Sequence, residues 1–342
     1  MTKMKRLALI AIVVLGGAVM LSAAYNLAVS TALQHRYPPP GTIYKVNGYA
    51  MHLYCAGAGA PTVIVEAGLG NDFIQWQKVQ PEVAKFTRVC TYDRAGLGWS
   101  DDQPDPHDAK HIAQQLHSLL QTAGENGPIV LVGASAGGLY ARQFVSDYPQ
   151  QVAGMVFSDS SVPDQVRDTP NGAWTPEKAR QIHHEAMWDL IKQSTGWARL
   201  RGGCKGDVEK GLDPWRDLAR AEACRPEYAR SGLSEWDEFW NSAAQATEAH
   251  CCGDIPLVIV SRDPDRPKPG RSAESVAVDP IWNGLQESLK RLSPQSRRVI
   301  ARGSGHHVMI ERPDVVIAAV REVVIEVRER RKAAAPGTTV VE

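Results

Sequence analysis

The 342-residue sequence has no excess of charge of either sign. Its 38 lysines and arginines are balanced by 38 aspartates and glutamates, and no basic stripe runs along any segment. A nucleic-acid interface needs positive charge clustered on one face, so this class of function is disfavoured. We therefore expect no nucleic-acid partner. The expected partner is a small-molecule substrate, and no obligate protein partner is implied.

Metal and redox motifs are also missing. The six cysteines form no Cys-x-x-Cys pair, and no cysteine–histidine cluster has zinc spacing. We therefore expect neither a metal nor a cofactor. The even number of cysteines suits an oxidising compartment. Cys251 and Cys252 are adjacent, and we expect them to bond elsewhere or stay free rather than bond with each other.

The chain has no internal repeat, and only residues 331–342 lose apolar periodicity, which predicts a flexible tail there. Apolar runs typical of buried strands alternate with segments of helical spacing. This alternation predicts an α/β fold with a mostly parallel central sheet flanked by helices. The expected core comprises residues 36–161 and 254–330.

Residues 162–253 interrupt this alternation with a helical, charged segment, which we call the cap. It follows the sixth expected strand and contains six tryptophans, Trp174, Trp188, Trp197, Trp215, Trp236 and Trp240. We expect these side chains to form an apolar wall of the pocket that covers a partly hydrophobic substrate. The alternative is that they form a small core within the cap.

The N-terminal segment, residues 1–35, is a signal anchor or a cleaved signal peptide. Lys3, Lys5 and Arg6 precede an apolar run that begins at Leu7 and is long enough to span a bilayer. Cleavage after the small residues 22–24 would instead release the rest as a secreted protein. Because apolar residues resume after Asn26, we favour the anchor, with the catalytic domain on the extracytoplasmic side.

The segment Gly133-Ala-Ser-Ala-Gly137 predicts a nucleophilic serine. An apolar strand, residues 129–132, precedes it and a helical segment follows, so Ser135 stands at a sharp strand-to-helix turn. A serine needs a base to accept its proton and an acid to orient that base. His306, on a glycine-flanked loop near the C-terminus, is the candidate base, although spacing alone does not separate it from His307.

In the order of its motifs the chain resembles the α/β-hydrolase fold superfamily from about residue 41 to residue 327. The motifs are the turn Ala67-Gly-Leu69, the loop Asp93-Arg-Ala-Gly-Leu-Gly-Trp-Ser100, the elbow around Ser135, and Gly305-His306 followed by Glu311 and Pro313. The resemblance implies that His306, five residues before Glu311, is the catalytic histidine. It also implies a helical cap inserted after the sixth strand and a disulfide between Cys55 and Cys90. Cys204 is left with Cys224, Cys251 or Cys252 as its partner.

The resemblance also suggests the remaining site residues. The acid commonly follows the penultimate strand, which favours Asp263, with Asp265 next to it and Asp159 after an earlier strand as alternatives. Backbone N–H groups of Leu69 and Ala136 are expected to form the oxyanion hole.

The implied function is a serine hydrolase that cleaves carboxylic esters through an acyl-enzyme. Two alternatives stay open: an amide or peptide hydrolase similar to proline iminopeptidases, and a non-catalytic binding protein on the same fold. Hydrolysis of carbon–carbon bonds also stays open.

Overall fold

The computed structural model describes residues 3–168, 175–206, 208–266 and 273–334, and of residues 273–278 the backbone alone. Trp174 therefore lies outside the described residues.

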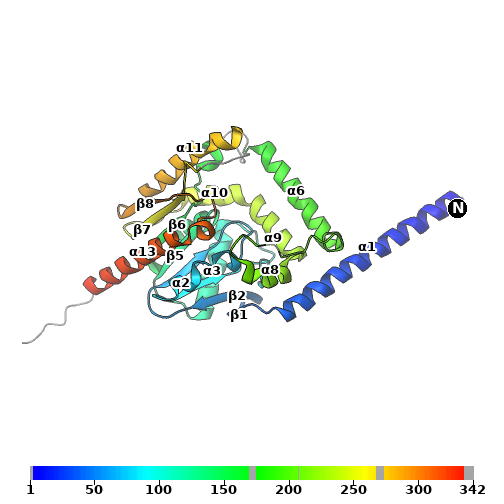
Figure 1. The fold of residues 1–342 in the computed structure, drawn as a ribbon, viewed down its shortest axis with the longest axis horizontal. Helices are drawn as coiled ribbons and strands as arrows, with labels where there is room; N and C mark the ends of the chain where they lie inside the picture. Colours follow the sequence, from blue (N-terminus) through cyan, green and yellow to red (C-terminus); the bar gives the residue numbers. More distant parts are fainter. Residues whose placement is uncertain (1–2, 169–174, 207, 267–272, 335–342) are drawn as a thin grey trace, which may run out of the picture.

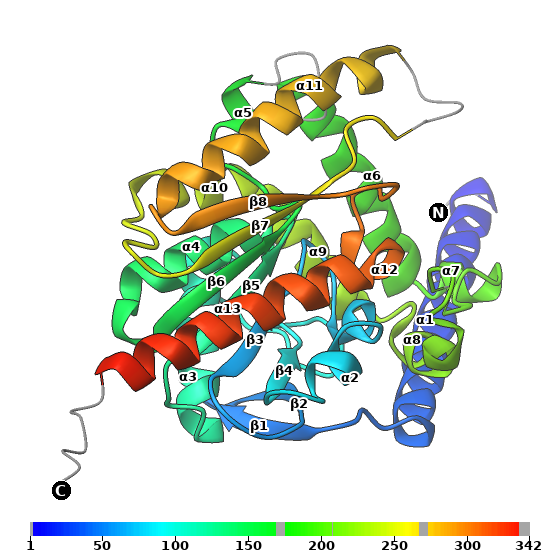
Figure 2. The same ribbon diagram turned by 60° about the vertical axis from the view of Figure 1, so that its left-hand side comes forward.

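Figures 1 and 2 show a central sheet with helices on both faces. The strands are β1 Thr42–Val46, β2 Tyr49–Ala56, β3 Thr62–Glu66, β4 Val89–Tyr92, β5 Ile129–Ala134, β6 Val152–Ser158, β7 Leu257–Arg262 and β8 Ser296–Ala301. The longer helices are α1 Lys3–Arg36, α3 Ala109–Ala123, α4 Gly137–Asp147, α6 Pro176–Ser194, α9 Pro226–Asp237, α10 Phe239–Glu248, α11 Ala273–Ser288 and α13 Pro313–Ala334. The shorter ones are α2 Gln80–Val83, α5 Gln165–Asp168, α7 Trp197–Leu200, α8 Arg216–Glu222 and α12 Val308–Glu311, with 3-10 turns η1 Phe73–Trp76, η2 Pro149–Gln151, η3 Asp213–Trp215 and η4 Leu289–Leu292.

The eight strands form one sheet in the order β1-β2-β4-β3-β5-β6-β7-β8. β1 and β2 form a hairpin, β2 pairs antiparallel with β4, and the other pairings are parallel. The predicted mostly parallel sheet is confirmed. Because parallel strands end at the same edge, the loops after β3, β5, β6, β7 and β8 meet at one edge of the sheet.

Both faces of the sheet are covered by helices. Along β5, Val130 and Val132 pack toward α13, whereas Ile129 and Leu131 pack toward α3 and α4. Strands buried on both faces read as continuous apolar runs, which is why these segments were recognisable in the sequence.

The cap separates β6 from β7, as expected. Between these strands the described residues form helices α5 to α10 and no strand. Helix α10 seats the cap on the core, because Phe239 and Ala243 pack against Leu139 and Tyr140 of α4.

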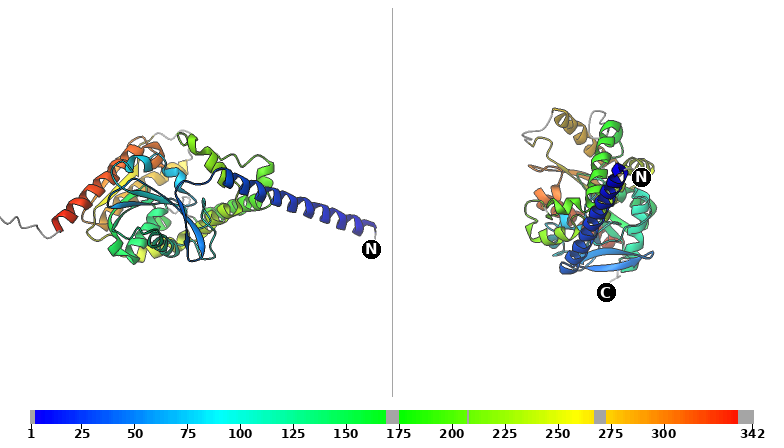
Figure 3. Two further views of the ribbon diagram at one scale, coloured as in Figure 1. Left: turned by 90° about the horizontal axis from the view of Figure 1, so that it is seen from below. Right: turned by 90° about the vertical axis from the view of Figure 1, so that its right-hand side faces the viewer.

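The two ends of the chain form long helices. Helix α1 projects from the body at its N-terminal end (Figure 3) and is long and apolar enough to cross a membrane by length and composition. Helix α13 runs to Ala334, so the tail that was expected to be flexible from residue 331 is helical as far as that residue. Arg330 pairs with Glu326 one turn earlier, and basic residues near the end suit the helix dipole.

The cysteines pair as three disulfides. The Cys55–Cys90 bond implied by the family resemblance is present, because these residues are register partners on β2 and β4. Cys204 bonds Cys224 within the cap. The expectation for the adjacent pair was wrong, since Cys251 bonds Cys252. The chain turns there, with positive φ at Cys252 and Gly253, and this turn brings the two side chains together.

Candidate active site

The turn between β5 and α4 holds Ser135 in a backbone conformation that few side chains adopt. Its φ is +50°, in the left-handed region typical of a nucleophile elbow. The flanking glycines allow close approach: a Cβ on Gly137 would lie 2.3 Å from the carbonyl oxygen of Glu66, and one on Gly133 would lie 2.8 Å from that of Gly137. The elbow glycines are therefore required by the packing of α4 on the end of β3.

His306 lies against Ser135, as the sequence predicts. Its Nε2 is 3.0 Å from the Ser135 hydroxyl, and its Nδ1 is 2.6 Å from Oδ2 of Asp159. His307 points elsewhere and pairs with Glu209 of the cap. The geometry thus brings together a hydroxyl, an imidazole and a carboxylate in hydrogen-bond sequence.

The carboxylate beside His306 is Asp159 and not the favoured Asp263, which corrects the expectation for the acid. Asp159 directly follows β6, the neighbour of the serine-bearing strand β5. Asp263 accepts a hydrogen bond from the Gly303 N–H at 2.8 Å and pairs with Arg302. Asp265 also pairs with Arg302, and its side chain is 78% exposed. Asp263 therefore holds the turn after β8 rather than the imidazole.

Asp159 is fully buried and kept ionised by its partners. Burial alone raises a carboxyl pKa, but the hydrogen bond and charge of His306, together with Arg262 and Trp282, hold the pKa of Asp159 below its ordinary value. Trp282 Nε1 donates at 2.9 Å and the Arg262 backbone N–H donates at 3.1 Å, both to Oδ1. These donors leave Oδ2 free to accept from the imidazole.

The turn after β3 lies directly beside the serine. A Cβ on Gly68 would lie 3.2 Å from the Ser135 Cβ, and Leu69 packs in the same cluster as Ala136. Ala136 opens α4, so its N–H stands at the positive end of that helix. The structure therefore brings both expected oxyanion residues to the serine's side.

Comparison with known proteins agrees with this architecture. The model of a family described as "Alpha/beta hydrolase family" matches residues 55–319. The chain belongs to the α/β-hydrolase family. Its sequence is 24% identical over 281 residues to the uncharacterized protein YqjL of Bacillus subtilis, covering 82% of this chain and 90% of that one.

Solved structures share the fold of this α/β-hydrolase. A thermophilic esterase from Thermogutta terrifontis superposes with a TM-score of 0.58 at 20% identity, covering 84% of this chain and 99% of its own. A haloalkane dehalogenase variant from Bradyrhizobium elkanii superposes with a TM-score of 0.62 at 15% identity, covering 85% and 98%. At these identities the likeness shows the fold, and the reaction has to be argued from the site.

Arg94 lies in the loop Asp93–Ser100, where its residue type alone indicates no role, and it contacts the turn beside Ser135. It is buried, and its guanidinium donates to the carbonyl oxygens of Ala67 at 2.9 Å and Gly68 at 2.6 Å. It also pairs with Glu66 of β3 and with Glu235 of cap helix α9. Glu235 in turn accepts from the Gly70 N–H at 2.7 Å. The proposed oxyanion turn is thus held on one side by the core and on the other by the cap.

The charges in this cluster are unequal, because one arginine faces two buried carboxylates. Burial raises the pKa of Glu66 to about 7, even though Arg94 and the Tyr92 hydroxyl favour its ionised form. Glu235 adds to the increase by repulsion. Desolvation opposes the charge of Arg94, but Glu235 and Glu66 outweigh it and raise the pKa of the guanidinium.

A cavity of about 680 Å³ lies between the cap and the core of this hydrolase. Its core side is formed by Asp72 and Gln75, which follow the oxyanion turn, and by Ile310, which follows the histidine loop. Its cap side includes Trp197 and Tyr228, so at least one expected tryptophan faces a cavity. The volume suits a small or medium organic molecule, and Ser135 and His306 are not among the lining residues.

Two buried carboxyls in the cavity wall share a hydrogen bond. Burial and the nearby charge of Asp72 raise the pKa of Glu222 well above its ordinary value of 4.5, and Glu222 bonds Asp72. A carboxyl with a raised folded-state pKa stabilises the fold fully below its unfolded pKa, and this contribution is lost as pH rises through the folded value.

As pH rises above about 4.5, we expect the melting temperature of the wild-type protein to fall more steeply than that of the Glu222→Gln variant. Glutamine keeps a donor for Asp72 and cannot ionise. Thermal unfolding between pH 5 and 8 in detergent measures the difference, with Glu227→Gln as a more exposed cap control. Parallel curves for wild type and Glu222→Gln would contradict the assigned shift.

Proposed function

We propose that this α/β-hydrolase is a serine hydrolase that cleaves carboxylic esters. Ser135 attacks the ester carbonyl while His306 accepts its proton and Asp159 stabilises the imidazolium. The N–H groups of Ala136 and Leu69 bind the developing oxyanion. His306 then returns the proton to the leaving alcohol, and water, activated by the same imidazole, releases the acid.

The hydrogen-bonded series Ser135–His306–Asp159 on a positive-φ elbow carries this proposal. A hydroxyl at the elbow forms an acyl-enzyme, whereas the haloalkane dehalogenase and epoxide hydrolase branches of the superfamily use an aspartate there. Esters need less activation of the leaving group than amides, because an alcohol leaves more readily than an amine.

We also propose that α1 is retained as an anchor with the catalytic domain outside the cytoplasm. The helix is continuous across the potential cleavage site at residues 22–24, and residues within and after this site contact the cap. Gly196 approaches the backbone of Ser22, and Asn26 is buried against the cap. Lys3, Lys5 and Arg6 then lie on the cytoplasmic side.

A fluorophosphonate probe tests the activated serine without knowledge of the substrate. We expect the wild-type protein to be labelled at Ser135 and to hydrolyse a short p-nitrophenyl ester, with the Ser135→Ala variant unlabelled and slower by at least about 10³-fold. A protein that stays unlabelled would contradict the serine hydrolase. Labelling without ester turnover would retain the nucleophile and reject the ester.

A further inference from the structure

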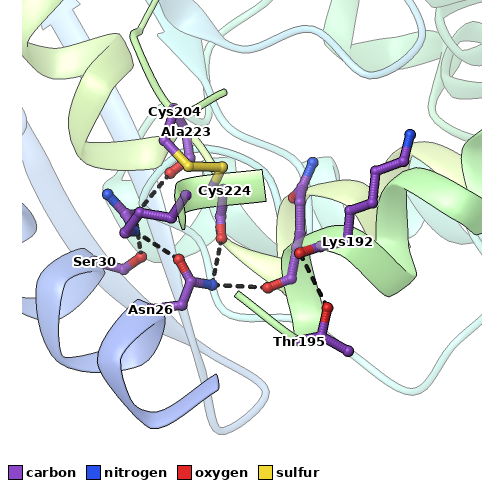
Figure 4. The surroundings of a disulfide bond; sticks show 9 residues. Asn26, Ser30, Lys192, Thr195, Cys204, Ala223 and Cys224 are labelled. Carbon is purple, nitrogen blue, oxygen red and sulfur yellow. Dashed lines mark hydrogen bonds between the residues drawn. A yellow bond between two sulfur atoms is a disulfide. The ribbon is translucent and has the colours of Figure 1, made fainter. Parts of the chain in front are cut away.

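The C-terminal half of α1 is part of the folded cap. Asn26 donates to the carbonyl oxygens of Gln193 and Cys224 at 2.8 and 3.0 Å, and Arg199 donates to Asn26 and Ser30 (Figure 4). These contacts surround the Cys204–Cys224 disulfide. The position of the cap relative to α1 is therefore fixed by buried polar contacts and not by a free linker.

The packing also fixes the depth of the cap. From Leu7 to Tyr25 α1 is apolar, and at about 1.5 Å per residue this stretch is about 28 Å long, close to the roughly 30 Å hydrocarbon thickness of a bilayer. Gly196 of the cap contacts Ser22, within one turn of the end of that stretch. If α1 spans the membrane, the junction of α6 and α7 lies at the membrane surface.

This junction exposes an apolar cap face, which we define as Met187, Trp188 and Ile191 of α6 with Trp197 and Leu200 of α7. These side chains are between 37 and 57% exposed. Outside α1, the only other large apolar side chains that the described residues expose are Ile43 and Ile325. Amphipathic aromatics with adjacent cations are typical of the membrane interface, and the Arg201 guanidinium lies 5.4 Å from the Trp197 ring centre.

The cavity adjoins this face. Trp197 belongs to both, and Lys192 and Arg201 line the cavity beside it. At its other end the cavity reaches Asp72 and Gln75, next to the turn that lies against Ser135. The cavity thus extends from the junction of α6 and α7 to Asp72 and Gln75, a few residues after the turn beside Ser135.

We propose that the apolar cap face docks into the surface of the membrane that α1 spans, and that the cavity receives amphipathic esters from that surface. The substrate part of this inference rests on the proposed esterase function and on the retained anchor. The docking part rests on the retained anchor and on the contacts of α1 with the cap, and does not depend on the esterase. A lipid surface is the occupant because α1 brings it to the same face of the cap.

Tryptophan quenching by brominated phospholipids tests the docking. The full-length protein is placed in vesicles of phosphatidylcholine and phosphatidylglycerol whose acyl chains carry bromine near the head-group end. Residues 1–36 contain no tryptophan, so α1 itself gives no signal. We expect quenching in wild type that is mostly lost in the Trp188→Phe, Trp197→Phe protein and kept in Trp240→Phe, a substitution in α10, which packs on α3 and α4 of the core.

Three outcomes overturn the docking: no quenching in wild type, equal quenching in the double variant, or an intact mass that lacks residues 1–24. Burial of the face by a second copy would leave quenching absent while the protein sediments as a dimer in detergent, and it would also overturn the proposal.

Charge insertion on the apolar cap face tests the substrate route. Ile191→Glu and Leu200→Glu do not alter residues that line the cavity. We expect kcat/KM for p-nitrophenyl laurate held in vesicles to fall by about tenfold, with p-nitrophenyl acetate in solution hydrolysed at the wild-type rate. An equal loss on both esters would overturn the route. Absence of turnover of both esters by wild type would instead reject the esterase, and the quenching result would stand on its own.

Discussion

Asp159→Asn lowers kcat for a soluble ester by about 10³-fold or more, and Asp263→Asn leaves kcat within a few fold of wild type. Asparagine keeps the shape of the side chain. However, its amide N–H groups can donate a hydrogen bond to Nδ1 of His306 only in the tautomer in which Nδ1 carries no proton. The imidazole then presents an N–H to Ser135 and cannot take its proton. Because the defect lies in proton transfer and not in substrate binding, we expect KM to change little.

The two variants differ in stability as well as in rate. Asp263 accepts from the Gly303 N–H and pairs with Arg302, so Asp263→Asn weakens the turn after β8 and lowers the melting temperature modestly. The rate of fluorophosphonate labelling gives a second measure, since it needs an activated serine but no acyl-enzyme hydrolysis. It should fall in Asp159→Asn and persist in Asp263→Asn. A fully active Asp159→Asn protein would remove Asp159 from the mechanism, and an inactive, folded Asp263→Asn protein would restore the acid that the sequence favoured.

The elbow could be predicted because its requirements are local. Glycines at 133 and 137 and an apolar strand before Ser135 are features of adjacent residues, and the structure adds only the distances. The parallel sheet was predictable for a similar reason, since strands buried on both faces are apolar at every position.

The acid could not be assigned because both aspartates satisfy the same sequence pattern. Asp159 follows β6, and Asp263 follows β7. These two strands are parallel neighbours, so both aspartates lie at the same edge of the sheet. What separates them is the direction of each carboxylate, set by long-range donors. Trp282 Nε1 and the Arg262 N–H orient Asp159, whereas the Gly303 N–H holds Asp263.

The role of Arg94 could not be predicted from the sequence for a similar reason. Its partner Glu235 lies 141 residues away in the cap, where no motif marks one acidic residue among many. A buried arginine needs several acceptors, but a sequence does not show that the residue is buried. The disulfide between Cys251 and Cys252 likewise depends on a local left-handed turn, which the residue types do not predict.

Glu235→Ala tests whether the cap completes the oxyanion turn. The variant removes the acceptor of the Gly70 N–H and two hydrogen bonds to Arg94. Arg94 is then held by Glu66 and the Ala67 and Gly68 carbonyls alone, and the turn loses its support from α9. We expect kcat to fall by about 10²-fold, the typical effect of losing one oxyanion donor. Breaking a buried ion pair also typically lowers the free energy of unfolding by about 3–5 kcal/mol.

A conservative variant separates positioning from stability. Glu235→Gln keeps an acceptor for the Gly70 N–H and leaves Arg94 paired with Glu66 as a neutral buried pair, so most of kcat should return although one charge is missing. Glu248→Ala, an exposed acid at the end of α10, serves as the cap control. Steady-state kinetics on a soluble ester, with melting temperatures, measure all three. If Glu235→Ala and Glu235→Gln lose kcat equally, or if kcat follows melting temperature across the set, Glu235 stabilises the cap without positioning the turn. If instead kcat recovers in Glu235→Gln at nearly constant KM, the cap contributes to transition-state binding through the backbone it holds, because only the oxyanion interaction grows as the ester carbonyl becomes tetrahedral.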